Sequence, residues 1–164
     1  MWLKKWLGIL GLATVTVTSP NISEAKKTKG VQTSNFDYHN NFPKVKSAYA
    51  LLINAKDDKT IRNAARSFVK ELYLLIKSLP QKADIMVKDG NIRKDKKRKA
   101  QALRNLKKLE DEIFGMLDVI KNKFGNDFKW TEDETLFDLS IGVGRYFVIA
   151  ENILEGVENP TSVE

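Results

Sequence analysis

The pattern most able to carry chemistry in this chain is a run of basic residues. Residues 93–99 read RKDKKRK, with six basic side chains and one acid, and an apolar stripe with helical spacing follows them. Such a run can bind anions, whether nucleic acid, a lipid surface or the acidic face of a protein. The sequence predicts as docking candidates Arg93, Lys94, Lys96, Lys97, Arg98 and Lys99.

Two interpretations of this basic run are open. Exposed lysines at the start of a helix oppose its dipole by roughly 0.3–1 kcal/mol per charge, so local helix stability does not explain them. The run either keeps the protein soluble or forms a docking surface for an anionic partner. The formal net charge of +7 suits an anionic partner but does not choose among the classes.

A second group of charged residues lies in LEDEIF (109–114), which contains Glu110, Asp111 and Glu112. Carboxylates at helical spacing can hold a hard cation. Acids beside lysines more often form a solvated face. We therefore expect no metal site there, and we expect Glu110, close to the apolar stripe, to pair with a basic residue of another helix.

Residues typical of catalysis are scarce. His39 is the only histidine and lies in a polar segment, whereas a di-iron bundle needs Glu-x-x-His pairs from two helices. The chain has no cysteine, which excludes disulfides, thiolate metal sites and a cysteine nucleophile. GVGRYF (142–147) lacks the third glycine and the preceding strand of a nucleotide-binding loop. We expect a non-enzymatic protein without a cofactor, in which Gly142 and Gly144 allow a neighbouring helix to approach.

The N-terminus has the pattern of a secretory signal peptide. Lys4 and Lys5 precede an uncharged, mostly apolar run over residues 7–17, and a small-x-small pattern ends at Ala25. We expect cleavage between Ala25 and Lys26. The run is shorter than the about 20 residues of a membrane span. An uncleaved anchor or a buried amphipathic helix is the alternative. Export argues against a nucleic-acid partner, and a cytosolic nucleic-acid binder would require the signal prediction to be wrong.

The rest of the chain has the apolar spacing of helices. Residues 26–42 form a polar arm without periodicity, and apolar residues then repeat at three and four positions over 43–56, 58–79, 95–124 and 132–155. Asp57 or Asp58 can cap the second helix, and Thr131 with Glu134 forms a capping box for the fourth. Pro80 is expected to end the second helix.

These elements predict an all-α fold in one domain. Residues 80–94 are expected to be a connection with Asp-Gly-Asn as a turn, in which Ile85, Met86 and Val87 contact the bundle. Connections of this length favour antiparallel neighbours, so we expect an up-down four-helix bundle over 43–156 and a tail over 157–164. The first helix is too short to run the full length of such a bundle.

Two stretches give the chain a family resemblance. SFVKELYLLIKSLPQKAD (67–84) and ALRNLKKLEDEIFGMLDVIKNK (102–123) resemble the PsbQ-type extrinsic proteins of photosystem II. The resemblance covers about residues 43–155. It implies a small, basic four-helix bundle without catalytic residues, which reaches the thylakoid lumen behind a signal sequence. The chain departs from cyanobacterial members, which look like lipoproteins, because it has no cysteine to carry a lipid.

The resemblance also implies a function. Members of that family sit on the lumenal face of photosystem II with other extrinsic subunits and support the oxygen-evolving manganese cluster and its retention of calcium and chloride. We therefore expect a non-enzymatic accessory subunit, associated with the membrane through a protein complex. The alternative is a periplasmic or secreted helical bundle that binds an anionic lipid, a wall polymer or a small ligand between helices near Gly142 and Gly144.

Overall fold

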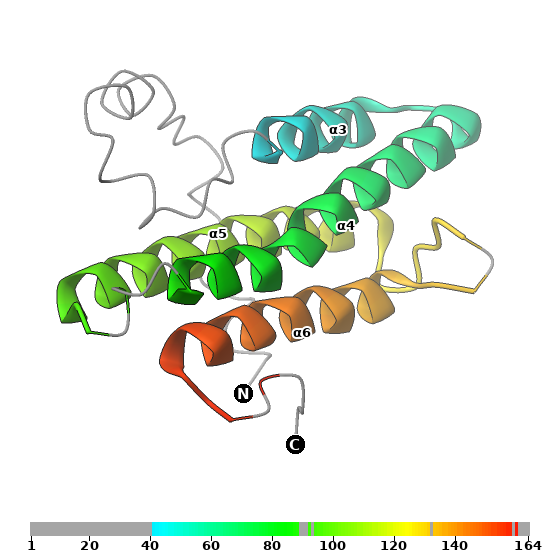
Figure 1. Cartoon of the computed structure of the whole chain (residues 1–164). Coiled ribbons are helices and arrows are strands. Elements are labelled where there is room, and N and C mark those ends of the chain that lie inside the picture. The colour runs from blue at the N-terminus through cyan, green and yellow to red at the C-terminus, as the bar shows by residue number, and fades with distance from the viewer. Residues whose placement is uncertain (1–40, 89–91, 93, 132, 159, 161–164) are drawn as a thin grey trace.

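The computed structural model describes residues 41–88, 92, 94–131, 133–158 and 160. These residues form four helices, α3 (Phe42–Asn54), α4 (Asp58–Lys88), α5 (Lys96–Phe124) and α6 (Leu136–Glu155). Successive helices run in opposite directions (Figure 1). The predicted all-α class is confirmed, and the arrangement is consistent with a four-helix bundle. The predicted signal peptide, its cleavage site and the arm up to residue 40 lie outside the described residues.

The helices do not pack in chain order. Helix α4 packs against α3 and α6, while α5 packs against α6 and more lightly against α3. No close backbone contact joins α4 and α5, so these two consecutive helices lie diagonally across the bundle. Helix α3 has 13 residues against 31 in α4. It covers only part of the longer helices, as predicted (Figure 1).

The apolar stripes of all four helices meet in one core. Leu52, Leu72, Ile113, Leu117 and Val143 are each at most 1% exposed. Burial of such a side chain stabilises the fold by about 1.5–3 kcal/mol. The spacing of three and four residues therefore predicted which faces of the helices pack together.

The start of α4 is fixed by Asp57, one of the two predicted caps. Its Oδ1 accepts from the Thr60 amide at 2.9 Å, and its carbonyl accepts from the Ile61 amide at 2.9 Å. The first pair satisfies an amide that has no partner within the helix. Asp58 is the first residue of the helix instead.

The prediction that Pro80 ends the second helix is wrong, because α4 continues through Pro80 to Lys88. The two buried residues beyond the proline, Ala83 and Met86, are 0% and 6% exposed. Their burial on a helical face offsets the lost hydrogen bond at position 80. Ile85, predicted to contact the bundle, is instead 52% exposed. The predicted Asp-Gly-Asn turn lies outside the described residues.

Replacing Pro80 by alanine should stabilise the protein. Alanine restores an amide that can donate to the Ile76 carbonyl one turn earlier, and it removes the clash of the proline ring with that carbonyl. We expect the free energy of unfolding to rise by about 2 kcal/mol, measured by urea denaturation followed by circular dichroism. The control is Gln81→Ala, an exposed neighbour that should change it by less than about 0.5 kcal/mol. A Pro80→Ala variant no more stable than the parent would contradict the helical continuation.

The prediction that Thr131 and Glu134 form the capping box of the fourth helix is wrong, although the Glu134 amide does donate to Thr131 Oγ1 at 3.0 Å. Helix α6 begins at Leu136, and Thr135 and Asp138 form the box. The Asp138 amide donates to Thr135 Oγ1 at 3.3 Å, and the Thr135 amide donates to Asp138 Oδ2 at 2.9 Å. Trp130 explains the shift, because its buried indole donates to Glu134 Oε2 at 3.1 Å and holds that segment as a loop.

The Asp138 cap should make stability depend on pH. Hydrogen bonds from the Thr135 amide and hydroxyl lower the pKa of Asp138 below its ordinary value. A lowered pKa in the folded state gives stabilisation above the unfolded pKa, and it is lost as the pH falls through the folded pKa. Asp138→Asn should therefore lower the melting temperature at about pH 7 and have little effect at about pH 2. Asp133→Asn, at an exposed acid nearby, is the control, and an equal loss at both pH values would contradict this account.

Candidate docking surface at the start of helix α5

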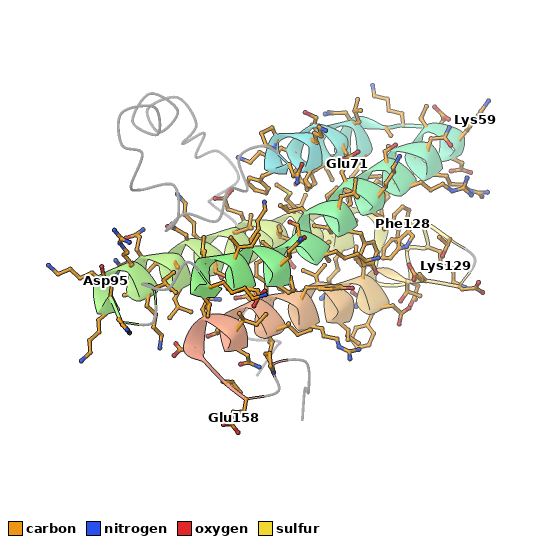
Figure 2. All side chains as sticks on the ribbon, viewed as in Figure 1. Lys59, Glu71, Asp95, Phe128, Lys129 and Glu158 are labelled. Carbon is orange, nitrogen blue, oxygen red and sulfur yellow. The ribbon has the colours of Figure 1, made fainter. Side chains whose placement is uncertain are left out.

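Asp95 positions the start of α5. Its Oδ1 accepts from the amides of Lys97 at 3.0 Å and Arg98 at 3.2 Å. A carboxylate at the N-terminus of a helix also interacts favourably with the helix dipole. The lysines beside it interact unfavourably with the same dipole. The single acid of the basic run therefore supplies the cap. Figure 2 shows Asp95 at the opposite end of the bundle from Lys59.

Two of the six docking candidates interact within the molecule. Arg98 Nε lies 3.4 Å from Asp95 Oδ2. Lys99 Nζ lies 2.6 Å from Glu155 Oε2, which joins the start of α5 to the end of α6. Both pairs are partly exposed, so each contributes about 0–1 kcal/mol. Arg98 and Lys99 therefore have intramolecular partners, and we do not include them in the candidate docking surface.

Three lysines of the run, Lys94, Lys96 and Lys97, are exposed and form no ion pair with the described part of the chain. With Asp95 and Arg98 they line a shallow depression that is wide open to solvent. We call these three lysines the α5 cluster. Arg93, the remaining candidate, lies outside the described residues. The α5 cluster places three positive charges where solvent or an anionic partner can reach them.

The acids of LEDEIF are neutralised by lysines. Lys107 Nζ lies 2.8 Å from Glu110 Oε2 and 2.8 Å from Asp111 Oδ1, and Lys46 Nζ of α3 lies 3.7 Å from Glu112 Oε2. The expectation that Glu110 pairs with another helix is therefore wrong. The described residues hold no group of three or more histidine, cysteine or acidic side chains that could bind a metal ion.

The pKa of Lys107 reflects this arrangement. Partial burial lowers the pKa of its ammonium group, but hydrogen bonds to Asp111 and Glu110 raise it by more, so the net shift is upward. Lys107 therefore stays charged over the ordinary pH range. A charged lysine between two carboxylates is an ion-pair network and leaves no vacant acid at this point of α5.

The two glycines of GVGRYF lie within α6 and form no loop. A Cβ placed on Gly142 would lie 3.5 Å from the Tyr73 hydroxyl oxygen of α4. This is ordinary van der Waals contact, so a Cβ would fit at position 142, and the expectation that this glycine is needed for the approach of a neighbouring helix is not supported. Burial, followed by the charges of Glu134 and Asp138 and the nearby Tyr146, raises the pKa of Tyr73.

Comparison with known proteins gives no assignment: no family model, no curated protein and no solved structure matches the chain. His39, the only histidine, lies outside the described residues. None of the described helices combines the length and apolar character needed to cross a membrane.

In the described residues, every buried side-chain nitrogen and oxygen has a hydrogen-bond partner. Of the site residues predicted from the sequence, the α5 cluster is thus the remaining candidate for a binding surface.

Proposed function

We propose that the chain is a non-enzymatic accessory protein that docks on an anionic protein surface through the α5 cluster. The observation that carries the proposal is the exposure of Lys94, Lys96 and Lys97 without an ion pair in the described structure, beside a cap that Asp95 already supplies. The resemblance to PsbQ-type proteins makes the proposal more specific. The anionic surface would then be the lumenal face of photosystem II with its other extrinsic subunits.

The energetics favour docking over solubility alone. Lys96 and Lys97 lie in the first turn of α5, where each exposed lysine opposes the helix dipole by roughly 0.3–1 kcal/mol. Solubility requires exposed charge but no particular position, and the chain already has 28 basic residues. The position of the α5 cluster, at a helix end that it destabilises, is more simply explained if these lysines bind a partner. Charges at the rim of such an interface mainly speed association and make it sensitive to salt.

The test is a triple substitution with a matched control. Lys94→Gln, Lys96→Gln and Lys97→Gln together should weaken rebinding to salt-washed photosystem II membranes by about 30-fold, at about 0.5–1 kcal/mol per charge pair. The variant should unfold at the midpoint of the parent or above it, because Asp95 and its cap remain and the opposition of the lysines to the helix dipole is removed. Sedimentation with increasing salt measures both affinity and salt dependence.

The control triple changes the same net charge elsewhere. Lys44, Lys56 and Lys108 are exposed on other parts of the described bundle, and their replacement by glutamine should change rebinding by less than about 2-fold. If both triples weaken rebinding equally, only net charge matters and the α5 cluster is no docking site. If neither does, the proposal fails for this surface.

A further inference from the structure

The solvent-facing side of α4 is basic along most of its length. Its exposed positions recur every three or four residues, which places them on one face of the helix. The α4 stripe consists of Lys59, Arg62, Arg66, Lys70, Leu74 and Lys77, all exposed. A helix rises 1.5 Å per residue, so the stripe is about 27 Å long.

The basic residues of the α4 stripe are not neutralised by the rest of the described structure. None of them forms an ion pair there. The acids of α4 beyond its first turn, Glu71 and Asp84, are only partly exposed, and Asp84 pairs with Lys88 at 2.6 Å. Lys77 lies over the Tyr73 ring, with Nζ 5.1 Å from its centroid. Apart from the exposed Asp57 and Asp58 at its start, the stripe is therefore a line of positive charge without an ion pair in the described structure.

Large apolar side chains interrupt and extend this line. Leu74 is 56% exposed within the stripe, and Ile85 is 52% exposed three turns further along the same face. A single exposed leucine is ordinary on a protein surface. Two aliphatic side chains beside five cations form a mixed face that can contact both the phosphates and the headgroup boundary of a membrane.

We propose that the α4 stripe binds the surface of an anionic lipid bilayer. The basic side chains would contact lipid phosphates, and Leu74 and Ile85 would enter the boundary between headgroups and acyl chains. A line of side chains along one face of a helix suits an extended surface such as that of a bilayer. Nucleic acid would use aromatic side chains for stacking, and the stripe has none. The inference uses other residues than the docking proposed for α5 and does not depend on it.

Vesicle flotation tests the electrostatic part. The full chain should float with vesicles of phosphatidylcholine mixed with phosphatidylglycerol. Each basic residue near such a surface contributes roughly 5-fold, so Arg62→Gln, Arg66→Gln and Lys70→Gln together should weaken binding by roughly 100-fold. The control triple at Lys44, Lys56 and Lys108 should retain at least half of the bound fraction. No flotation, or equal loss in both triples, overturns the proposal.

A site-specific label tests the apolar part. Because the chain has no cysteine, a single Leu74→Cys substitution can carry an environment-sensitive fluorophore at one known position. Its emission should shift to the blue on addition of the mixed vesicles and not of pure phosphatidylcholine vesicles. Leu51→Cys on α3, where the leucine is 67% exposed, is the matched control and should not shift. Equal shifts at both positions overturn the proposal, as does a shift at position 74 only with an acidic protein or RNA.

Discussion

Phe68→Ala should lower the free energy of unfolding by about 4 kcal/mol. Phe68 is 1% exposed in the contact between α4 and α3, and its ring centroid lies 6.2 Å from that of Tyr49. Alanine would leave a cavity that the helices can fill only in part, because two helices fix its walls. Urea denaturation followed by circular dichroism measures the change, and an unchanged slope against urea would show that the loss lies in the native packing.

The matched control for this prediction is Phe137→Ala. It removes the same side chain from a helix, but Phe137 of α6 is 64% exposed. Surface substitutions of this kind change stability by less than about 0.5 kcal/mol. If Phe68→Ala costs no more than Phe137→Ala, then α3 does not pack on α4 as described, and the bundle would lose one of its helices.

Trp130→Ala should have an effect of similar size, about 3–5 kcal/mol. Trp130 lies in the loop between α5 and α6 and is 4% exposed. Its indole reaches Glu134, and a bridge between Lys129 and Thr135 closes the loop around it. Loss of the indole removes both the packing and the anchor that sets where α6 begins.

Trp130→Phe separates these two contributions. Phenylalanine keeps most of the apolar volume and loses the hydrogen bond to Glu134, so it should cost about 1–2 kcal/mol. A Trp130→Phe variant as unstable as Trp130→Ala would assign the effect to the hydrogen bond alone. A stable Trp130→Ala variant would contradict the burial of this loop.

The periodic positions show how far the fold could be predicted from sequence. Val45, Leu72, Leu117 and Val143 recur with their neighbours at three and four residues, and each is fully buried as predicted. A long amphipathic pattern reports the helix and its buried face because both follow from the same geometry. The order of packing could not be predicted in this way, since the diagonal placement of α4 and α5 depends on contacts between segments far apart in the chain.

The element boundaries show where prediction failed. Pro80 has a strong local cost for a helix, but Ala83 and Met86 gain burial if the helix continues, and only the tertiary structure supplies that gain. The α6 capping motif occurs twice in a row, at Thr131 and at Thr135. Local sequence could not choose between them, because the choice depends on the burial of Trp130.

The candidate sites divide in the same way. The α5 cluster could be predicted from the sequence because it is part of a run of basic residues. The ion pair between Lys99 and Glu155 could not, because it joins the ends of two helices that are far apart in the chain. The α4 stripe was not predicted, yet its signal is in the sequence. Lys59, Arg62, Arg66 and Lys70 repeat at three and four residues, on the side of α4 away from its apolar stripe.

The central claim is that the chain docks on a membrane-bound protein complex by charge. The most direct test is a salt-stepped wash of native membranes from the source organism, with the chain followed by mass spectrometry and the washed membranes resolved on native gels. The account predicts that the chain, cleaved before Lys26, migrates with photosystem II after low-salt washes and leaves in high salt. A chain that never migrates with a protein complex, even where it stays on the membranes, would contradict it.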